Sequence, residues 1–534
     1  SALVPTYSFP PPPNPPPVTA GQSLHNLQAP RRSHPGFFSP TTIISPIYQY
    51  FMSPLPSSVT ALSAPGKVLL TGGYLVLDRG YTGTVFALDA RIHVIVQQLR
   101  RGHRRGASGS GPAGGADVPS NVGAEDQDGQ DTVVVRSPQF LNAVWEYGVQ
   151  RCGNGGGVKV IQKGDGPRNP FVETSLSYAL TYISYVADSK DFGSLSVTIM
   201  ADSDYYSETA ASRGPASQGR GGRFVNFGVP LFEAHKTGLG SSAALVTALV
   251  SALVIHRTMQ PEDLGAGRDK LHNLAQAAHC AAQGKVGSGF DVASAVYGSC
   301  LYRRFSPSIL ESLGDVGSAG FEERLFPIVE DSDPEHPWDT ECVDFGMQLP
   351  RGMQLVLCDV DCGSQTPSMV KKVLEWRNNN RKEADILWAS LQNNNERLRQ
   401  ELKRQAQHPD ANPEGDFSDI RTLIQRTRQH IRTLTRRTGV PIEPSVQTEL
   451  LDSVSEIEGV IGGVVPGAGG YDAIALLIQD DSTVIARLRE HLTNWTSSIE
   501  DDFGGKIGNV RLLGVQHGSE GAKNEMLEQY AGWV

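Results

Sequence analysis

Short hydrophobic runs, in which polar and apolar positions alternate or β-branched residues gather, begin at residue 59. The runs 59–64 and 67–71 flank Pro65-Gly66, and the runs 84–88 and 92–96 follow with the same character. Runs of this length, bounded by turn residues, predict β-strands. A sheet is therefore expected to begin here.

Three segments of the same half have the apolar spacing of helices, and a further strand is predicted at 195–200. Two of the helices are expected at 175–186 and 269–283. The third, 241–255, is apolar and carries no charge before His256. Because this run is interrupted by serines and is short for a bilayer span, we expect a core helix and no membrane segment.

The second half also mixes helical and strand patterns. A strand at 353–357 leads into a long charged helical region at 367–407, and a strand at 473–478 follows further helices. Mixed elements in both halves predict an α+β fold with two domains, at 58–342 and 343–534, and a cleft between them.

Three segments have a composition that opposes packing. Residues 1–57 contain 14 of the 34 prolines and only Arg31 and Arg32 as charged residues, which predicts a disordered tail. The stretches at about 101–131 and 207–222 are rich in Gly, Ala and Ser and have no periodic apolar face. They are expected to be mobile insertions in loops.

Charge and cysteine content narrow the class of protein. The net charge is −10 over 534 residues and the basic residues are scattered, which argues against nucleic acid as a partner. Six cysteines are few for this length and favour free thiols in a reducing compartment. We expect a cytoplasmic protein that binds no membrane, with no obligate protein partner evident.

The most informative stretch for chemistry is the glycine-rich turn at 236–244, which opens directly onto the apolar helix predicted above. Gly238 and Gly240 allow backbone N–H groups to converge on an anion, and the positive end of the helix dipole adds attraction. Ser241 and Ser242 place two hydroxyls where a phosphate oxygen or a metal ion could reach them. The alternative is a capped helix without a ligand.

Three other segments carry candidate chemistry. Lys67 follows a Pro-Gly turn and enters an apolar strand, where a lysine is costly to bury without an anion. Asp291 follows the small-residue segment 284–289, and residues 467–470 form a glycine turn before a strand. Each has an alternative: a strand-edge lysine that reaches water, a carboxylate that stabilises a helix dipole, and an ordinary turn.

Taken together, these segments resemble the GHMP kinase superfamily, whose three motifs occur here in the family's order. The residues at 63–74, 284–294 and 467–473 are similar to those of the fungal phosphomevalonate kinases, and the resemblance covers roughly residues 59–534. It implies a two-domain GHMP kinase fold with an N-terminal nucleotide-binding domain and a C-terminal α/β domain. It also implies transfer of the γ-phosphoryl group of ATP to 5-phosphomevalonate with Mg²⁺ as cofactor, in the mevalonate route to isoprenoids and sterols.

The resemblance assigns roles to the residues at matching positions. Lys67 and Asp291 are the predicted catalytic residues. The predicted ATP-binding residues are Lys236, Gly238, Leu239, Gly240, Ser241, Ser242 and Ala243, of which Ser241 and Ser242 are also the predicted metal ligands. The predicted substrate-binding residues are Ser288, Gly289, Ser364, Thr366, Ser368, Lys371, Lys372, Gly469 and Gly470. Thr366 and Pro367 are expected to start a helix as N-cap and first helical residue.

Two departures from the wider superfamily bear on function. Gly73-Tyr74 stands where galactokinase and mevalonate kinase have Glu-His, and the position of a magnesium-binding glutamate falls near Cys280, a poor ligand for that ion. The alternatives are therefore mevalonate kinase, diphosphomevalonate decarboxylase, or a non-catalytic ligand sensor on the same fold. The presence of both Lys67 and Asp291 argues against a sensor.

Overall fold

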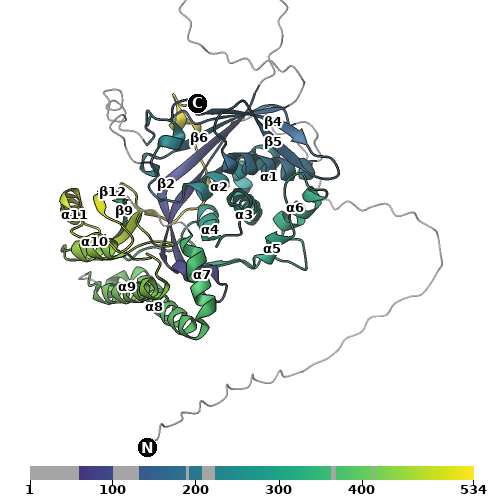
Figure 1. Cartoon of the computed structure of the whole chain (residues 1–534). Coiled ribbons are helices and arrows are strands. Elements are labelled where there is room, and N and C mark those ends of the chain that lie inside the picture. Colours follow the sequence, from purple (N-terminus) through teal and green to yellow (C-terminus); the bar gives the residue numbers. More distant parts are fainter. Residues whose placement is uncertain (1–58, 100–130, 188–191, 207–222, 363–367, 413–414) are drawn as a thin grey trace, which may run out of the picture. The chain divides into compact units, whose positions relative to one another are not determined.

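A computed structural model of the chain describes residues 59–99, 131–187, 192–206, 223–362, 368–412 and 415–534 (Figure 1). The predicted tail at 1–57 lies outside the described residues. So do the predicted insertions at about 101–131 and 207–222, apart from Asp131.

The first sheet is built around two long strands, β1 (Thr60–Thr71) and β2 (Gly83–Gln98), which pair antiparallel. The strand character predicted for 59–64, 67–71, 84–88 and 92–96 is confirmed, but the predicted division of each long strand into two was wrong. In β1 the register with β2 shifts between Pro65 and Lys67, so the Pro-Gly pair forms a bulge within a continuous strand and not a turn.

Ten strands make up this sheet, and its main path has the order β14-β1-β2-β6-β3-β4-β5. Only the β3–β6 pair is parallel among the described pairings. The remaining strands are β3 (Thr132–Arg136), β4 (Val144–Arg151), β5 (Val158–Lys163), β6 (Leu195–Ala201), β7 (Cys300–Arg303), β8 (Glu341–Val343), β13 (His517–Gly518) and β14 (Lys523–Asn524). The predicted strand at 195–200 is thereby confirmed.

Helices α1 (Pro170–Ala187), α2 (Ser241–Thr258) and α3 (Arg268–Gln283) contact one another, and α1 and α2 also pack on strands of the first sheet (Figure 1). The predicted helix at 175–186 begins earlier, at Pro170, where proline suits the first helical position. Short helices complete this layer: α4 (Phe290–Tyr297), α5 (Ser308–Glu311) and α6 (Phe321–Glu330).

Helix α2 is longer than the apolar run predicted. With 18 residues it is long and apolar enough to cross a membrane, so the expectation that it is too short was wrong. In the structure, however, 72% of this helix is buried inside the protein, as in the core helix of a soluble protein.

The second sheet has four antiparallel strands in the order β10-β11-β9-β12. Their bounds are β9 (Met353–Cys362), β10 (Val460–Val464), β11 (Ala473–Gln479) and β12 (Ile507–Leu512). Successive side chains of a strand point to opposite faces, and in β9 both faces are covered. Leu355 and Leu357 belong to the hydrophobic core that includes the first sheet, whereas Val356 and Cys358 belong to a second core.

The helices of this region are α7 (Met369–Asn379), α8 (Arg381–Gln407), α9 (Ser418–Thr438), α10 (Ser445–Ser455) and α11 (Ser482–Asn494). Helices α9, α10 and α11 contact strands of this sheet, whereas α7 and α8 contact α9. The predicted helical region at 367–407 is thus two helices with a break at Asn380. Helix α7 begins at Met369 and its N-cap position is Ser368, so the prediction that Pro367 is the first helical residue was wrong. Thr366 and Ser364 lie outside the described residues.

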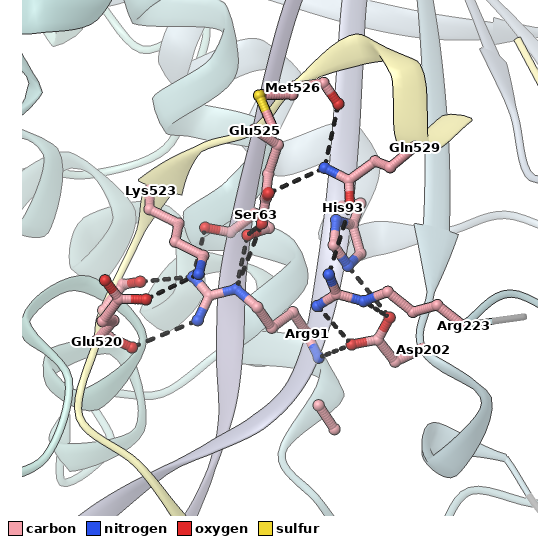
Figure 2. Close-up of polar contacts among 12 residues, drawn as sticks. Ser63, Arg91, His93, Asp202, Arg223, Glu520, Lys523, Glu525, Met526 and Gln529 are labelled. Carbon is pink, nitrogen blue, oxygen red and sulfur yellow. Dashed lines mark hydrogen bonds and ion pairs between the residues drawn. The ribbon is translucent and has the colours of Figure 1, made fainter. Parts of the chain in front are cut away.

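The end of the chain returns to the first sheet. β13 pairs with β2 and β14 pairs with β1, so the first sheet is not confined to the predicted domain 58–342. Polar contacts secure this return: Figure 2 shows Glu525 and Gln529 beside Ser63 and Arg91 of β1 and β2. The described residues belong to one compact unit, and the division into two domains at residue 342 stays a prediction.

Candidate active site

The glycine loop leads into helix α2 as the sequence predicted. The helix begins at Ser241, and Gly240 before it has a φ of 82°, a left-handed conformation that favours glycine. The backbone N–H groups of residues 238–243 donate no hydrogen bond to any described residue. Unpaired N–H groups at the positive end of a helix dipole are suited to bind an anion such as phosphate. Lys236, at the entrance of the loop, is exposed.

Strand β1 brings Lys67 against this loop. The Lys67 backbone N–H donates to the carbonyl oxygen of Leu239 at 3.0 Å. The side chain then runs beside Gly240: a Cβ atom added there would lie 2.8 Å from Lys67 Cε. Gly240 is therefore needed twice, for its backbone conformation and for the close approach of the lysine.

Lys67 as a whole residue is half-buried, and its ammonium group makes no ion pair within 4.0 Å with any described residue. Its Nζ lies 5.7 Å from the centre of the Phe290 ring, within the range of a cation–π contact. Burial lowers the pKa of Lys67, and the charge of Asp291 opposes this effect. A cation in this setting would be stabilised by an anionic ligand.

Asp291 lies in the first turn of α4, close to both earlier motifs. Its side chain is 22% exposed, and Oδ1 accepts a hydrogen bond from the Val292 N–H at 3.0 Å. The preceding Gly289 has a φ of 84°, and a Cβ there would lie 2.7 Å from the Tyr302 hydroxyl oxygen. That hydroxyl donates to the Ser288 carbonyl at 2.6 Å. These contacts fix the turn from which α4 and Asp291 start.

A residue that the sequence analysis missed, His279 of α3, lies between the glycine loop and Asp291. Its side chain is 3% exposed, and Nε2 is 3.2 Å from Ser242 Oγ and 3.8 Å from Asp291 Oδ2. Burial lowers the pKa of His279 and Asp291 opposes this shift. The sequence holds one indication of it: the family resemblance puts the superfamily's magnesium-binding glutamate near Cys280, the residue that follows His279.

The glycine turn at 467–470 lies against the end of β1 and the 3₁₀ helix η2 (Gly73–Leu77). The Gly467 N–H donates to the Leu69 carbonyl at 3.4 Å, and the Tyr74 hydroxyl donates to the Ala468 carbonyl at 2.8 Å. The tyrosine that replaces the superfamily's histidine thus joins the first motif to the third, a role the sequence analysis did not foresee.

The other predicted substrate residues are brought together only in part. A Cβ on Gly470 would lie 3.8 Å from the Met369 sulfur at the start of α7, and Gly469 packs closely on Ile442. Lys371 is 78% exposed and lies 3.8 Å from Glu375. Lys372 and Ser368 are also exposed. The role of this group in substrate binding stays a prediction.

Comparison with known proteins adds independent evidence. The GHMP kinases N terminal domain model matches residues 225–299. The chain is 75% identical over 485 residues to a phosphomevalonate kinase of Aspergillus fumigatus, covering 90% of this chain and 100% of that protein. It is 47% identical over 485 residues to one of Gibberella zeae, covering 89% and 98% respectively. A protein of Arabidopsis thaliana named phosphomevalonate kinase, peroxisomal, is 34% identical over 485 residues, covering 79% and 90%.

Solved structures agree on the fold. A phosphomevalonate kinase of Streptococcus pneumoniae, in complex with phosphomevalonate and AMPPNP, superposes with a TM-score of 0.51 at 13% identity, covering 85% of this chain and 99% of that one. The Lin0012 protein of Listeria innocua gives 0.52 at 18% identity, covering 86% and 100%.

Fold and site together define a GHMP kinase, as the sequence predicted. The long matches to fungal relatives make the assignment narrower. The chain belongs to the phosphomevalonate kinase family.

Proposed function

We propose that this chain transfers the γ-phosphoryl group of ATP to the phosphate of 5-phosphomevalonate, giving 5-diphosphomevalonate and ADP. One observation carries the proposal: Lys67 lies against the loop 238–243, whose backbone N–H groups are unpaired. Among the described residues, Lys67 has no anionic partner within ion-pair range. Family membership supplies the acceptor.

Phosphoryl transfer depends mainly on positioning and on neutralising charge. The N–H groups of the loop 238–243 hold the ATP phosphates, and Lys67 neutralises charge on the transferred group. The hydrogen bond from the Lys67 N–H to Leu239 keeps the ammonium group and the loop in a fixed relation. The acceptor occupies the side of Asp291 and the turn 467–470, where the Tyr74–Ala468 hydrogen bond holds the third motif beside the first.

The residues present fit a magnesium ion held largely by nucleotide. Ser242 Oγ and Asp291 Oδ2 both lie close to His279 Nε2, at 3.2 and 3.8 Å. No group of three or more His, Cys, Asp or Glu side chains suited to a metal occurs among the described residues. Mg²⁺ is commonly bound by one or two protein oxygens together with substrate phosphates and waters. Ser242 would contribute the hydroxyl oxygen that helps to hold such an ion, and the ion would supply neutralisation of charge on the nucleotide phosphates.

Asp291 is proposed as a positioning group and not as a general base. The second pKa of a phosphate monoester is near 6, so the acceptor oxygen is already largely anionic at pH 7 and no proton has to be removed. Asp291 and Lys67 are further apart than an ion pair allows. The Asp291 carboxylate therefore acts on the Lys67 ammonium group by electrostatic attraction over a distance and not by direct contact.

For Asp291→Asn we expect kcat to fall by less than about 100-fold, the lower end of what a general base contributes. The pH profile of kcat should keep its shape. Loss of an ionisation from that profile in the variant would show that Asp291 acts as a base. The matched control is Asp269→Asn in α3, whose carboxylate accepts from the Tyr297 hydroxyl and lies outside the site.

A panel of acceptors tests the proposed reaction directly. ADP release from ATP is measured with mevalonate, 5-phosphomevalonate and 5-diphosphomevalonate. We expect turnover with 5-phosphomevalonate alone. Turnover with mevalonate, or carbon dioxide release from the diphosphate, would assign a different GHMP enzyme, and tight binding without turnover would indicate a sensor.

The cytoplasm is proposed as the site of action. All six cysteines are free, as the sequence predicted, which suits a reducing compartment. Imaging of the full chain together with a peroxisomal marker tests this, because one plant relative is named as peroxisomal. Coincidence with the marker would overturn the proposal.

A further inference from the structure

His279 contacts the glycine loop from a neighbouring helix. It lies on α3 and reaches across to Ser242, the second residue of α2, with Nε2 at 3.2 Å from Oγ. The same nitrogen lies 3.3 Å from the amide nitrogen of Gln283, one helical turn further along α3. Asp291 Oδ2 is 3.8 Å away.

These neighbours determine the direction of the hydrogen bonds. An amide NH₂ group can only donate, so with the Gln283 amide as placed, Nε2 of His279 accepts and its ring proton is on Nδ1. Nε2 has a single lone pair in the ring plane, so the Ser242 hydroxyl, the nearer of the two groups at 3.2 Å, donates to it and shares it with the Gln283 amide. The hydroxyl proton is directed toward α3, and both oxygen lone pairs remain for a ligand on the other side. Ser241, by contrast, has no side-chain hydrogen bond to a described residue.

We propose that His279 is a positioning residue that accepts the Ser242 hydroxyl proton and so presents the Ser242 oxygen, in preference to that of Ser241, to the magnesium–nucleotide complex. The inference rests on the proposed function for the identity of the ligand. The single Nε2 lone pair is occupied by these donors and is not available to a metal or a substrate proton, so His279 acts through Ser242.

Outer partners of this kind typically contribute 10- to 100-fold to metal affinity or activity. We expect His279→Ala to raise the KM for ATP and to lower kcat, by about tenfold in kcat/KM. The KM for 5-phosphomevalonate should stay within about twofold. His279→Gln, whose side-chain carbonyl can accept at a similar reach, should recover most of the loss.

Calorimetry of ATP binding gives a readout that does not depend on turnover. Affinity is measured with magnesium and again with EDTA for the wild type and His279→Ala. We expect the variant to lose about tenfold with magnesium and to be unchanged in EDTA. Equal losses in both conditions would mean a general structural role and would overturn the inference.

The matched control is His256→Ala. His256 lies at the other end of α2, where Nδ1 is 3.0 Å from Thr60 Oγ1, so it is a half-buried histidine that contacts one hydroxyl. Its loss should leave magnesium-dependent ATP affinity unchanged. The midpoint of thermal unfolding is recorded for all variants, and His279→Gln keeps the test valid if His279→Ala fails to fold.

A double-mutant cycle tests the path of the effect. In a Ser242→Ala background, His279→Ala should add no further loss of magnesium-dependent affinity, whereas in a Ser241→Ala background the two effects should add. Additive losses with Ser242→Ala would refute coupling through that hydroxyl. If the wild type fails to phosphorylate 5-phosphomevalonate, the proposed function falls, but the calorimetric cycle still decides the inference.

Discussion

Two cations on neighbouring strands of the first sheet, the buried Arg91 and the half-buried Lys67, have opposite surroundings. Arg91 of β2 donates to the Ser63 hydroxyl at 2.6 Å, to the Gly521 carbonyl at 2.5 Å, and lies 3.8 Å from Glu525 (Figure 2). Lys67 of β1 has no anionic partner in ion-pair range among the described residues. The protein thus satisfies one cation by itself and leaves the other to a ligand.

The surroundings of Asp202, which accepts a hydrogen bond from the Arg91 backbone N–H at 2.8 Å, show the same contrast. Burial by itself raises the pKa of Asp202, but hydrogen bonds from His93 and Arg223 outweigh it, so the net pKa is lowered. For Lys67 burial prevails over the single distant charge of Asp291, and the pKa of the ammonium group is lowered. A buried charge that is fully paired within the protein stabilises the fold, whereas a charge left without a partner is typical of binding sites.

The largest effect is expected from breaking the complete cluster. Arg91→Met leaves Glu525 and the polar groups around it buried without their cation, which costs about 3–5 kcal/mol of unfolding free energy. Urea denaturation measures it. Activity per folded molecule should be unchanged. Arg487→Met is the control: its partner Glu458 is 88% exposed, and surface pairs of this kind contribute about 0–1 kcal/mol. Similar losses in both variants would contradict the distinction.

The incomplete site should respond in the opposite way. Lys67→Met removes the charge proposed to neutralise the transferred phosphoryl group, and kcat should fall by about 100- to 1000-fold, the range for one such electrostatic contact. The free energy of unfolding without nucleotide should not decrease, because no protein anion loses its partner. A variant as destabilised as Arg91→Met would show that Lys67 has a structural partner.

A third effect comes from the glycine that admits the lysine. Gly240→Ala and Gly238→Ala both place alanine at positive φ, 82° and 72°, at a cost of about 1–2 kcal/mol each. Only at Gly240 would the new methyl group meet Lys67, with Cε at 2.8 Å, since nothing lies within 4 Å at Gly238. Gly240→Ala should therefore lose about 10- to 100-fold more kcat/KM than Gly238→Ala. Equal losses would indicate that Lys67 does not depend on Gly240.

The parts of this site that could be predicted are those in which a short sequence segment determines the local conformation. A glycine loop before an apolar helix, a lysine after Pro65-Gly66 and an aspartate after small residues each impose a local conformation. Their common site was predicted from the family resemblance. In the structure Lys67 contacts the glycine loop, and Ser242 and Asp291 both lie near His279, but their joint role stays a prediction.

The parts that were missed depend on contacts distant in sequence. Pro65-Gly66 has the composition of a turn, and only pairing with β2 shows that the strand continues through a bulge. The pairing of β14 with β1 joins segments that no local pattern connects. His279 lies within an ordinary buried helical face, and its significance arises only when α3 packs beside Ser242.

The smallest expected effect is the pH dependence of the unfolding free energy. Its sign distinguishes an unpaired Lys67 from a paired cation such as Arg91. The pKa of Lys67 is lowered in the folded protein, so between that value and the ordinary 10.5 the unfolded chain binds a proton that the folded chain does not. The wild type should therefore gain stability relative to Lys67→Met as pH rises through this window. At pH 7 Lys67→Met should be the more stable of the two without nucleotide, and the difference should shrink toward pH 10.5. Urea denaturation at several pH values measures this. A wild type that is more stable at pH 7 and loses its advantage on raising the pH would mean that Lys67 is paired within the protein, as Arg91 is.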